Sequence, residues 1–410
     1  MRVLLLNQFF HPDLSATSQI ATDLAEDLAA SGVEVTALSG RGSYLGGKQL
    51  GARDEHRGVQ IVRASATSLG KRTLLHRGMD YASFYATAGA ALARLPRHDV
   101  MIAMTTPPLI AAAAAALKGP KRSRLVYWVQ DLYPDVAVAF GALGPRSPLT
   151  RMMAAASRAV MRRADRVVVL GEVMGERCVA SGADPARISV IPNWADAAAV
   201  HPVEHGRNSL RDGLANGART VVMYSGNMGL AHDIATLLGA ARRLRDRRDV
   251  AFVFIGDGAR KRDVEAAARE LPNLRLEPYQ ARERLAESLS AGDLHLIGLS
   301  PEIEGLIEPS KLYGIMAAGR PALFVGPEGS EVARTIVRHD CGRVLRNGDA
   351  EGLASAIAEL ADDHDLRIAM GERARAVLEQ RYARRVATAR FKGLLEELCT
   401  VPGVAGAATA

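Results

Sequence analysis

Short apolar runs alternate with longer segments of helical periodicity along almost the whole chain of 410 residues. Seven of these runs lie in the first half of the chain, at residues 3–6, 33–38, 59–64, 100–104, 125–129, 166–170 and 188–191. Five more lie in the second half, at residues 220–224, 251–255, 274–277, 294–297 and 322–325. Strands that alternate with helices form parallel sheets covered by helices on both faces. The pattern therefore predicts an α/β protein with two Rossmann-like, doubly wound parallel-sheet domains.

A polar stretch at residues 195–218 separates the two series of strands and has little hydrophobic periodicity, so it marks the expected linker. We expect an N-terminal domain over residues 1–197 and a C-terminal domain over residues 198–378. A further helix is expected at about residues 379–398. Residues 399–410 are rich in small side chains and are expected to form a disordered tail.

The net charge of +7 comes from 52 basic and 45 acidic residues, which are dispersed along the chain. Aromatic residues make up only 5% of the chain, and few of them lie among the basic clusters. A stacking platform for nucleic acid needs such aromatic side chains. The charge therefore favours an anionic substrate or a membrane surface as partner, and no nucleic acid.

Cysteine usage and hydropathy indicate where the protein works. Cys178, Cys341 and Cys399 are widely separated and have neither metal-binding nor redox spacing, which favours a reduced, cytoplasmic protein. The longest apolar run, residues 109–117, is far shorter than the roughly 20 residues that span a bilayer. Residues 1–7 enter a strand without a signal-peptide pattern. We expect no membrane-spanning segment.

The segment from Glu308 to Pro321 connects two predicted strands and carries the clearest sign of a ligand. Pro309 and Ser310 suit the first turn of a helix, because proline lacks an N–H group and serine can cap. Lys311 follows at a position where the helix dipole disfavours a cation unless an anion docks there. The segment predicts a phosphate-binding unit, and the alternative is an ordinary turn with a solvated lysine.

Two glycine-containing turns follow the first two strands of the second domain. Ser225, Gly226, Asn227 and Gly229 form the first turn, where the glycines let the backbone approach a ligand closely. The alternative is a tight turn without a ligand.

The second turn contains Gly256 and Gly258 and leads into a helix that begins with Arg260 and Lys261. Either basic residue could neutralise a phosphate group, and we favour Lys261 over Arg260. The alternative is a solvated pair on a helix face. Tyr279 ends the next strand.

The first domain offers polar side chains after two of its strands. Ser15, Thr17 and Ser18 follow the first strand in a turn that has no glycine, which argues against a dinucleotide-binding enzyme. Gln130 and Asp131 end the strand at residues 125–129, where a carboxylate lies at the carboxyl edge of the sheet. Asp131 could accept or hold the proton of a hydroxyl group, or it could be a structural loop aspartate.

In this order, these loops resemble those of glycosyltransferase family 4, especially bacterial enzymes of colanic-acid, O-antigen and exopolysaccharide synthesis. The resemblance covers residues 1 to about 395 and implies the GT-B fold, in which two Rossmann-like domains face a cleft. It also implies that the helix at residues 379–398 crosses back to the first domain. This chain departs from the family at the positions of two glutamates. Leu306 and Gly314 occupy the positions of the two usual glutamates, the second of which commonly holds the nucleotide ribose.

The resemblance implies a retaining transfer of a sugar from a nucleotide donor, such as a UDP-linked N-acetylated hexosamine. The implied acceptor is a polyprenyl-diphosphate-linked saccharide, with the enzyme peripheral at the cytoplasmic face of the inner membrane. Asp131 and Lys261 would be catalytic, and Gln130, Ser15, Thr17 and Ser18 would face the acceptor. The donor-binding residues would be Ser225, Gly226, Asn227, Gly229, Gly256, Gly258, Arg260, Tyr279, Glu308, Pro309, Ser310 and Lys311.

Neither a cofactor nor a metal ion is expected, because no Asp-x-Asp pair follows a strand and GT-B enzymes generally need no metal. Two other functions stay open at this point. One is an enzyme similar to UDP-N-acetylglucosamine 2-epimerase, and the other is a non-catalytic partner in a polysaccharide assembly complex. Residues 73–97 mix apolar and basic side chains and predict either an interfacial helix or a helix buried against the first sheet.

Overall fold

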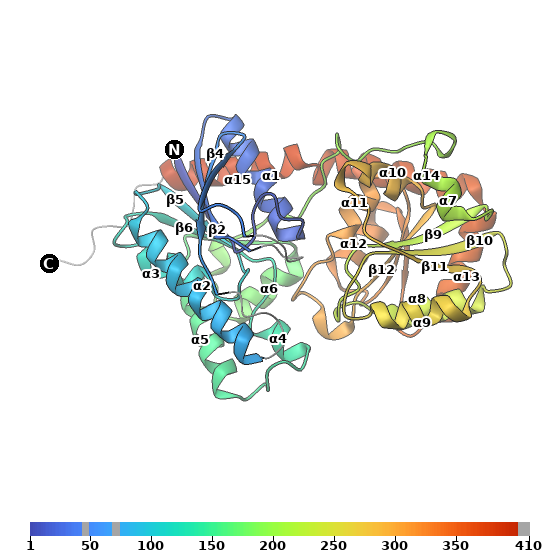
Figure 1. Ribbon diagram of the computed structural model, residues 1–410, viewed down its shortest axis with the longest axis horizontal. Coiled ribbons are helices and arrows are strands. Elements are labelled where there is room, and N and C mark those ends of the chain that lie inside the picture. Colours follow the sequence, from blue (N-terminus) through green and yellow to red (C-terminus); the bar gives the residue numbers. More distant parts are fainter. Residues whose placement is uncertain (43–48, 68–73, 401–410) are drawn as a thin grey trace. The chain divides into compact units, whose positions relative to one another are not determined.

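The structure is a computed structural model that describes residues 1–42, 49–67 and 74–400 of the chain. The chain divides into two compact units, each with its own parallel sheet (Figure 1). Unit 1 comprises Met1–Pro192 and Ala387–Ala410, and unit 2 comprises Asn193–Val386. The predicted fold class, two doubly wound α/β domains, is therefore confirmed.

Unit 1 is built on an eight-stranded sheet with the strand order β3-β4-β2-β1-β5-β6-β7-β8. Within the described part of the chain, β3 is the one strand that runs antiparallel to its neighbour. Its strands are β1 Arg2–Leu6, β2 Glu34–Gly40, β3 Arg53–His56, β4 Val59–Ala64, β5 Val100–Ala103, β6 Arg124–Trp128, β7 Arg166–Val169 and β8 Ile188–Val190. Its helices are α1 Ala16–Ala30, α2 Leu74–Arg94, α3 Ala111–Leu117, α4 Asp135–Ala139, α5 Pro148–Arg163 and α6 Glu172–Ala180.

Unit 2 has a six-stranded parallel sheet with the order β11-β10-β9-β12-β13-β14, which is the order of the dinucleotide-binding fold. Its strands are β9 Thr220–Ser225, β10 Val250–Ile255, β11 Leu274–Glu277, β12 Leu294–Gly298, β13 Ala322–Val325 and β14 Gly342–Leu345. Its helices are α7 Arg211–Ala215, α8 Ile234–Arg243, α9 Lys261–Glu270, α10 Leu285–Ser290, α11 Lys311–Ala317, α12 Glu331–His339, α13 Ala350–Asp362 and α14 His364–Val377.

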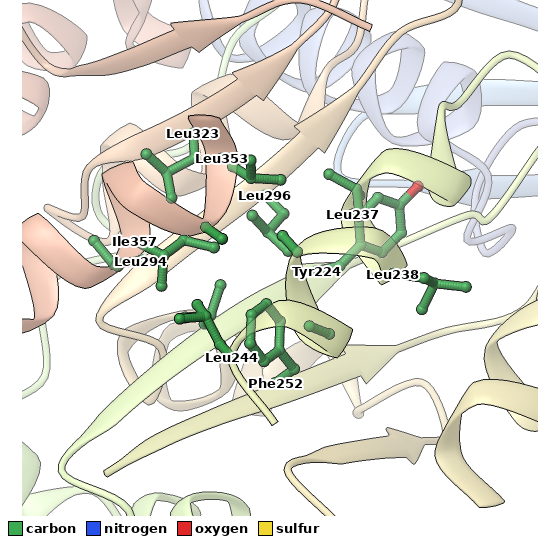
Figure 2. Close-up of a cluster of buried hydrophobic side chains, with 14 of the residues drawn as sticks. Tyr224, Leu237, Leu238, Leu244, Phe252, Leu294, Leu296, Leu323, Leu353 and Ile357 are labelled. Atoms are coloured by element: carbon green, nitrogen blue, oxygen red, sulfur yellow. The ribbon is translucent and has the colours of Figure 1, made fainter. Parts of the chain in front are cut away.

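The core of unit 2 explains why its strands are apolar at almost every position. On β9, Val222 and Tyr224 pack into one cluster of buried side chains, while Val221 and Met223 pack into another. Consecutive strand residues point to opposite faces, so both faces of the sheet are covered. In the larger cluster, Leu237 of α8 and Ile357 of α13 lie with side chains of the central strands (Figure 2).

All twelve predicted strands are present, and two further strands occur at sheet edges. Residues 53–56 of β3 are mostly exposed and carry no apolar alternation, so no pattern indicated a strand there. Residues 342–345 of β14 are only partly buried. Among the described residues, none of the helices combines the length and the apolar composition that crossing a bilayer requires.

The last helix, α15 Arg384–Thr400, contributes residues 387–400 to unit 1. Its Phe391 ring lies 4.6 Å from the Trp128 ring of β6, and Thr388 donates a 2.9 Å hydrogen bond to Asp27. Residues 195–218, the expected linker, belong to unit 2, where α7 buries Leu214 and Ala215. Of the tail expected at residues 399–410, the part from residue 401 lies outside the described residues.

Candidate active site

The two glycine turns of unit 2 pack against each other at the carboxyl ends of β9 and β10. Met228 donates a 2.8 Å hydrogen bond to the carbonyl of Asp257, and Arg260 donates one of 2.9 Å to the carbonyl of Met228. Gly256 has a φ of 135°, and a Cβ atom there would overlap the carbonyl oxygen of Gly226. Only glycine allows this close approach of two backbones. The loops that sequence analysis assigned separately therefore form one surface.

The Lys311 side chain joins this surface from the beginning of α11. Its Nζ atom lies 3.2 Å from the carbonyl oxygen of Asn227 and 4.9 Å from the centre of the Tyr224 ring. It also lies 3.3 Å from Nε2 of His232. Gly226 leaves room for this side chain, because a Cβ atom there would stand 3.0 Å from Cε of Lys311. The ammonium of Lys311 thus donates one hydrogen bond to the first glycine turn, at Asn227, and another to His232.

The hydrogen bonds of His232 determine how its ring is protonated. Nδ1 lies 2.7 Å from the carbonyl oxygen of Gly298, which can only accept, so Nδ1 carries the proton. Nε2 is then free to accept a hydrogen bond from Lys311. Burial, followed by the charge of Lys311, lowers the pKa of His232 to about 3. Burial also lowers the pKa of Lys311 to about 7. Among the described residues, no carboxylate forms an ion pair with this lysine.

Glu308 lies three residues before Lys311 and is 7% exposed. Among the described residues, its Oε1 atom has no hydrogen-bond partner. Burial, followed by the charges of Glu331 and Glu304, raises the pKa of Glu308 to about 8. At neutral pH, this carboxyl group is protonated and can donate a hydrogen bond to a ligand. The neighbouring Pro309 is buried.

The other predicted donor residues of unit 2 lie at the same edge of the sheet. Ser225 is the last residue of β9 and is half-buried. Tyr279 is 48% exposed, and its ring would be 3.3 Å from a Cβ atom at Gly256. Lys261 lies 3.8 Å from Asp257 of the second glycine turn, whereas Arg260 forms its 3.4 Å ion pair with Asp263 within α9. Lys261 is thus the basic residue that turns toward the glycine loops.

One detail differs from the expectation for the segment that begins α11. Ser310 occupies the N-cap position, but its side chain makes no capping hydrogen bond, so the expected serine cap is wrong. The residue has helical backbone angles, φ −66° and ψ −12°, whereas a capping serine is usually extended. The helix ends at Ala317, and Gly319 follows two residues later with a φ of 64°.

Leu306 and Gly314, which replace the two usual glutamates of the family, are both involved in packing. Leu306 is 4% exposed. A Cβ atom at Gly314 would lie 3.3 Å from Cδ1 of Leu289 on α10, which is tighter than ordinary contact. Glycine at residue 314 therefore lets α11 pack closely against α10.

In unit 1, Gln130 and Asp131 follow β6 at the carboxyl edge of the sheet. The backbone N–H groups of both residues lie about 3.3 and 3.2 Å from the hydroxyl of Thr105, which follows β5. Gln130 is buried, and burial raises the pKa of Asp131 to about 6. The sheet order places the end of β5 between those of β6 and β1. The pKa of the Asp131 carboxyl group thus lies close to neutral pH.

The predicted acceptor residues Ser15, Thr17 and Ser18 lie at the start of α1, which begins at Ala16. Ser15 is its N-cap without a side-chain capping bond, and Thr17 and Ser18 lie in the first helical turn. We expected Thr17 and Ser18 in a turn, but both residues are helical. The hydroxyl groups of Ser15 and Ser18, and Oδ1 of Asn7, are buried without a hydrogen-bond partner among the described residues. Such groups would gain from a ligand that supplies hydrogen bonds.

Sequence reasoning missed His232, although it lies in the same loop as Gly226 and Asn227. It also missed Thr105 and Asn7. A polar residue directly after a parallel strand was the available signal for Asn7 and Thr105. The role of His232 depends on a contact with Lys311, which is 79 residues away in the chain.

Comparisons with known proteins agree with this arrangement. Residues 16–194 match the family described as Glycosyl transferase 4-like domain, and residues 219–363 match Glycosyl transferases group 1. The chain is 31% identical over 308 residues to the probable glycosyltransferase WbjE of Pseudomonas aeruginosa, covering 74% of this chain and 76% of the relative. It is 24% identical over 352 residues to the putative colanic acid biosynthesis glycosyl transferase WcaI of Escherichia coli, covering 82% and 85%.

A solved structure of similar fold is that of Anabaena HepE in complex with UDP and glucose. It aligns with a TM-score of 0.72 at 15% identity and covers 97% of this chain and all of HepE. The likeness shows that the chain has the GT-B fold of two doubly wound domains. The chain belongs to the family 4 glycosyltransferases and resembles the colanic-acid and O-antigen enzymes of that family.

Proposed function

We propose that the protein transfers a sugar from a UDP-linked donor, such as an N-acetylated hexosamine, to a polyprenyl-diphosphate-linked saccharide. The observation that carries the donor part is the ammonium of Lys311, held 3.2 Å from the carbonyl of Asn227 beside two packed glycine turns. The first glycine turn follows β9 and the segment of Lys311 follows β12, the two neighbouring strands at which the strand order of the sheet reverses. Ligands of doubly wound folds bind at this point.

The donor diphosphate would lie along Gly226–Gly229, with Lys311 and Lys261 as its cationic neighbours. When the glycosidic bond breaks, the leaving diphosphate gains negative charge, and preorganised cations stabilise that charge. The third N–H group of Lys311 would bind a phosphate oxygen, and His232 would keep the ammonium in place. The relative HepE binds UDP and glucose in its solved structure, which supports a UDP-linked donor here.

The remaining donor residues would hold the nucleoside and the sugar. The exposed Tyr279 ring beside Gly256 offers an aromatic face to the base. Glu308, protonated at neutral pH, would donate a hydrogen bond to a donor hydroxyl. Gly314 cannot supply the ribose contact that a glutamate makes in the family, so we assign this contact to Glu308.

The acceptor would bind to unit 1. Asp131 would hold or deprotonate the attacking hydroxyl, because its pKa of about 6 leaves it ionised yet basic at neutral pH. The partnerless hydroxyls of Ser15 and Ser18 would bind the acceptor saccharide or its phosphate. We infer retention of the anomeric configuration from the family alone. The similarity to WcaI, named for colanic acid biosynthesis, supports a role in cell-surface polysaccharide synthesis.

We also propose peripheral contact with the cytoplasmic face of the inner membrane. In α2, Phe84 and Leu92 are fully buried, so one face of this helix packs within unit 1. Met79 and Tyr81 of the same helix are 49% and 37% exposed and are available to a lipid surface.

Helix α5 adds a second surface of the same kind. Leu149 and Met152 are 47% and 63% exposed, and Arg151 and Arg158 are exposed on the same helix. Exposed apolar side chains next to cations suit a membrane interface with anionic lipids. The protein should sediment with anionic vesicles at low salt and be released by high salt. Sedimentation that persists at high salt would contradict an electrostatic contact.

Incubation of the purified protein with a panel of nucleotide sugars and a membrane lipid extract tests the function. We expect a glycosylated lipid product that requires both donor and acceptor, and that still forms in EDTA because no metal is expected. Epimerised nucleotide sugar without acceptor would instead indicate an enzyme similar to UDP-N-acetylglucosamine 2-epimerase. No turnover with any donor would favour a non-catalytic assembly partner.

A further inference from the structure

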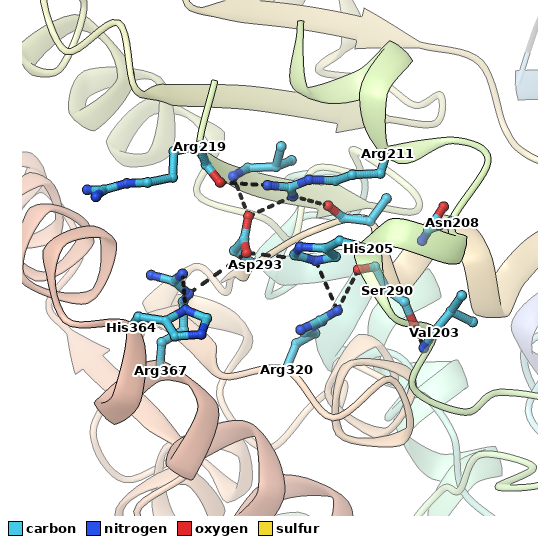
Figure 3. A network of polar contacts seen from close by, with 12 residues as sticks. Val203, His205, Asn208, Arg211, Arg219, Ser290, Asp293, Arg320, His364 and Arg367 are labelled. Carbon is cyan, nitrogen blue, oxygen red and sulfur yellow. Dashed lines mark hydrogen bonds and ion pairs between the residues drawn. The ribbon is translucent and has the colours of Figure 1, made fainter. Parts of the chain in front are cut away.

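Unit 2 contains a second polar centre, at the amino ends of β9, β12 and β13, opposite the glycine turns. Asp293 precedes β12, Arg320 precedes β13, and Arg211 and Arg367 reach this point from α7 and α14 (Figure 3). Arg211 and Arg367 are each 6% exposed, and Asp293 is 3% exposed. Three guanidinium groups thus surround a single carboxylate in the interior.

Asp293 accepts its hydrogen bonds through one of its two carboxylate oxygens. Its Oδ2 atom accepts a 2.6 Å bond from Arg211 and a 2.7 Å bond from the backbone N–H of Val221. Its Oδ1 atom lies 3.8 Å from Nε of Arg367 and 3.8 Å from Nε2 of His205. One carboxylate therefore compensates about one of the three positive charges.

The other partners of these arginines are neutral. Arg320 donates to the carbonyl of Ser290 at 2.8 Å and to Nε2 of His205 at 3.1 Å. Arg367 donates to the carbonyl of Leu360 at 2.5 Å and to Nδ1 of His364 at 3.0 Å. A guanidinium can only donate, so both imidazoles accept from it and are uncharged at those nitrogens. Backbone carbonyls at helix ends carry only partial negative charge.

The surrounding charges do not remove this excess. Arg219 and Arg247 form ion pairs of 2.8–3.4 Å with Asp249 and Asp362, so these two cations and two anions balance. Asp363, the N-cap of α14, adds one negative charge near Arg367. Among the described residues, Nε of Arg320 is buried without an acceptor. Positive charge and hydrogen-bond donors are thus both in surplus.

A cavity of about 290 Å³ opens beside this centre. It is lined by His205, Arg219, Asp293, Ala361, Asp362, His364 and Arg367. Because Nδ1 of His364 accepts from Arg367, the ring carries its proton on Nε2 and can donate it to a ligand. Guanidinium groups match the oxygen atoms of phosphate in geometry as well as in charge.

We propose that this cavity binds a phosphate group, either as inorganic phosphate or as a phosphate monoester. Arg367, Arg219 and His364 would donate to its oxygens, and the bound anion would compensate the surplus charge of Arg211, Arg320 and Arg367. The site is distinct from the donor loops, because it lies at the opposite edge of the same sheet. A ligand that binds the folded state only also stabilises that state. Phosphate should therefore stabilise unit 2 against unfolding.

The test is a phosphate titration monitored by thermal unfolding, with sodium chloride at equal ionic strength as the salt control. It is done in a Lys311→Gln background, so that phosphate at the donor loops does not contribute. We expect a saturable rise of about 2–4 °C in the unfolding midpoint with phosphate. An equal rise with chloride would overturn the proposal, because it would show only general screening.

Two variants of equal charge locate the site. Arg219 lines the cavity, whereas Arg247 binds the same aspartates from outside it. Arg219→Gln should weaken phosphate binding about tenfold, and Arg247→Gln should leave it unchanged. Equal phosphate affinity in the two variants would refute the assignment. Titration with a hexose 6-phosphate identifies the source: tighter binding than inorganic phosphate indicates a phosphate ester, and weaker binding indicates the free ion.

Discussion

Raising the pH from 7 to 9 tests the proposed role of Lys311 in binding the donor diphosphate. In the ligand-free protein, burial lowers the pKa of Lys311 to about 7, so the side chain loses its charge above this pH. A bound diphosphate favours the ammonium form and moves the pKa back toward the ordinary value of about 10.4. Binding then takes up a proton. UDP affinity should be greatest below pH 7 and should decrease as the pH rises toward 10.

The size of the effect follows from the pKa of about 7. At pH 8, Lys311 is charged in about one molecule in ten, so this side chain should take up about 0.9 proton when one UDP molecule binds. The affinity should fall about tenfold for each pH unit above 7, equivalent to about 1.4 kcal/mol per unit. His232 does not contribute, because its pKa of about 3 keeps it neutral throughout this range.

Calorimetric titration with UDP at pH 8, in two buffers that differ in ionisation enthalpy, measures the number of protons taken up. Lys311→Arg is the matched control, because arginine stays charged at this pH. Glu308, whose pKa is about 8, can take up a proton in both proteins when UDP binds. The wild type should therefore take up about 0.9 proton more than the variant at pH 8, and its affinity should fall more steeply between pH 8 and 9. Proton uptake near zero in the wild type, or equal uptake in Lys311→Arg, would refute the reasoning.

Four further predictions concern single residues. Burial raises the pKa of Glu308 to about 8, so the folded protein loses stability as the pH rises from about 4.5 to 8. In urea unfolding, the free energy of unfolding of Glu308→Gln relative to that of the wild type should therefore increase by about 2–4 kcal/mol from pH 5 to pH 8. The same difference in unfolding free energy at both pH values would contradict this. Asp131→Asn should lower the rate of sugar transfer about 10²-fold without changing UDP affinity. Transfer by the wild type should decline below pH 6, where Asp131 becomes protonated. Weakened UDP binding in the variant would contradict the assignment of Asp131 to the acceptor site. Lys261→Ala should lower turnover more than Arg260→Ala, and the reverse order would show that the wrong basic residue was chosen. Gly314→Glu should lower stability by about 1–3 kcal/mol, with a smaller loss in Gly314→Ala, and a well-folded Gly314→Glu protein that binds UDP more tightly would contradict the observed packing.

The strand-and-helix rhythm made the fold predictable, because buried parallel strands are apolar at nearly every position. Two edge strands were not predicted, because strands that are exposed or only partly buried do not need to be apolar. Strand β3 pairs on one side only and is mostly exposed, so its polar residues Arg53–His56 carry no pattern. The start of α1 at Ala16 was also missed, since Thr17 and Ser18 are poor helix formers and favour caps and turns.

Positions directly after strands were predictable as candidate site residues, because parallel strands bring their carboxyl ends to one edge. The sequence could therefore assign Gly226, Gly256 and Lys311 to one region. It could not supply the partner of Lys311, since His232 is 79 residues away and its ring orientation depends on the carbonyl of Gly298. The second polar centre of unit 2 could not be predicted for the same reason, because its residues are spread between His205 and Arg367 in the chain.

The charge states of Lys311 and Glu308 together indicate which ligand the donor loops can accept. Burial moves the pKa of Lys311 down to about 7 and that of Glu308 up to about 8, so near pH 7.5 both groups are largely uncharged in the empty site. A cationic ligand would have to ionise Glu308 next to Glu304 and Glu331, whose charges oppose this step. A diphosphate would instead charge Lys311 and leave Glu308 protonated as a hydrogen-bond donor. We therefore infer that the loops favour an anionic ligand that also carries hydroxyl groups, as a nucleotide sugar does.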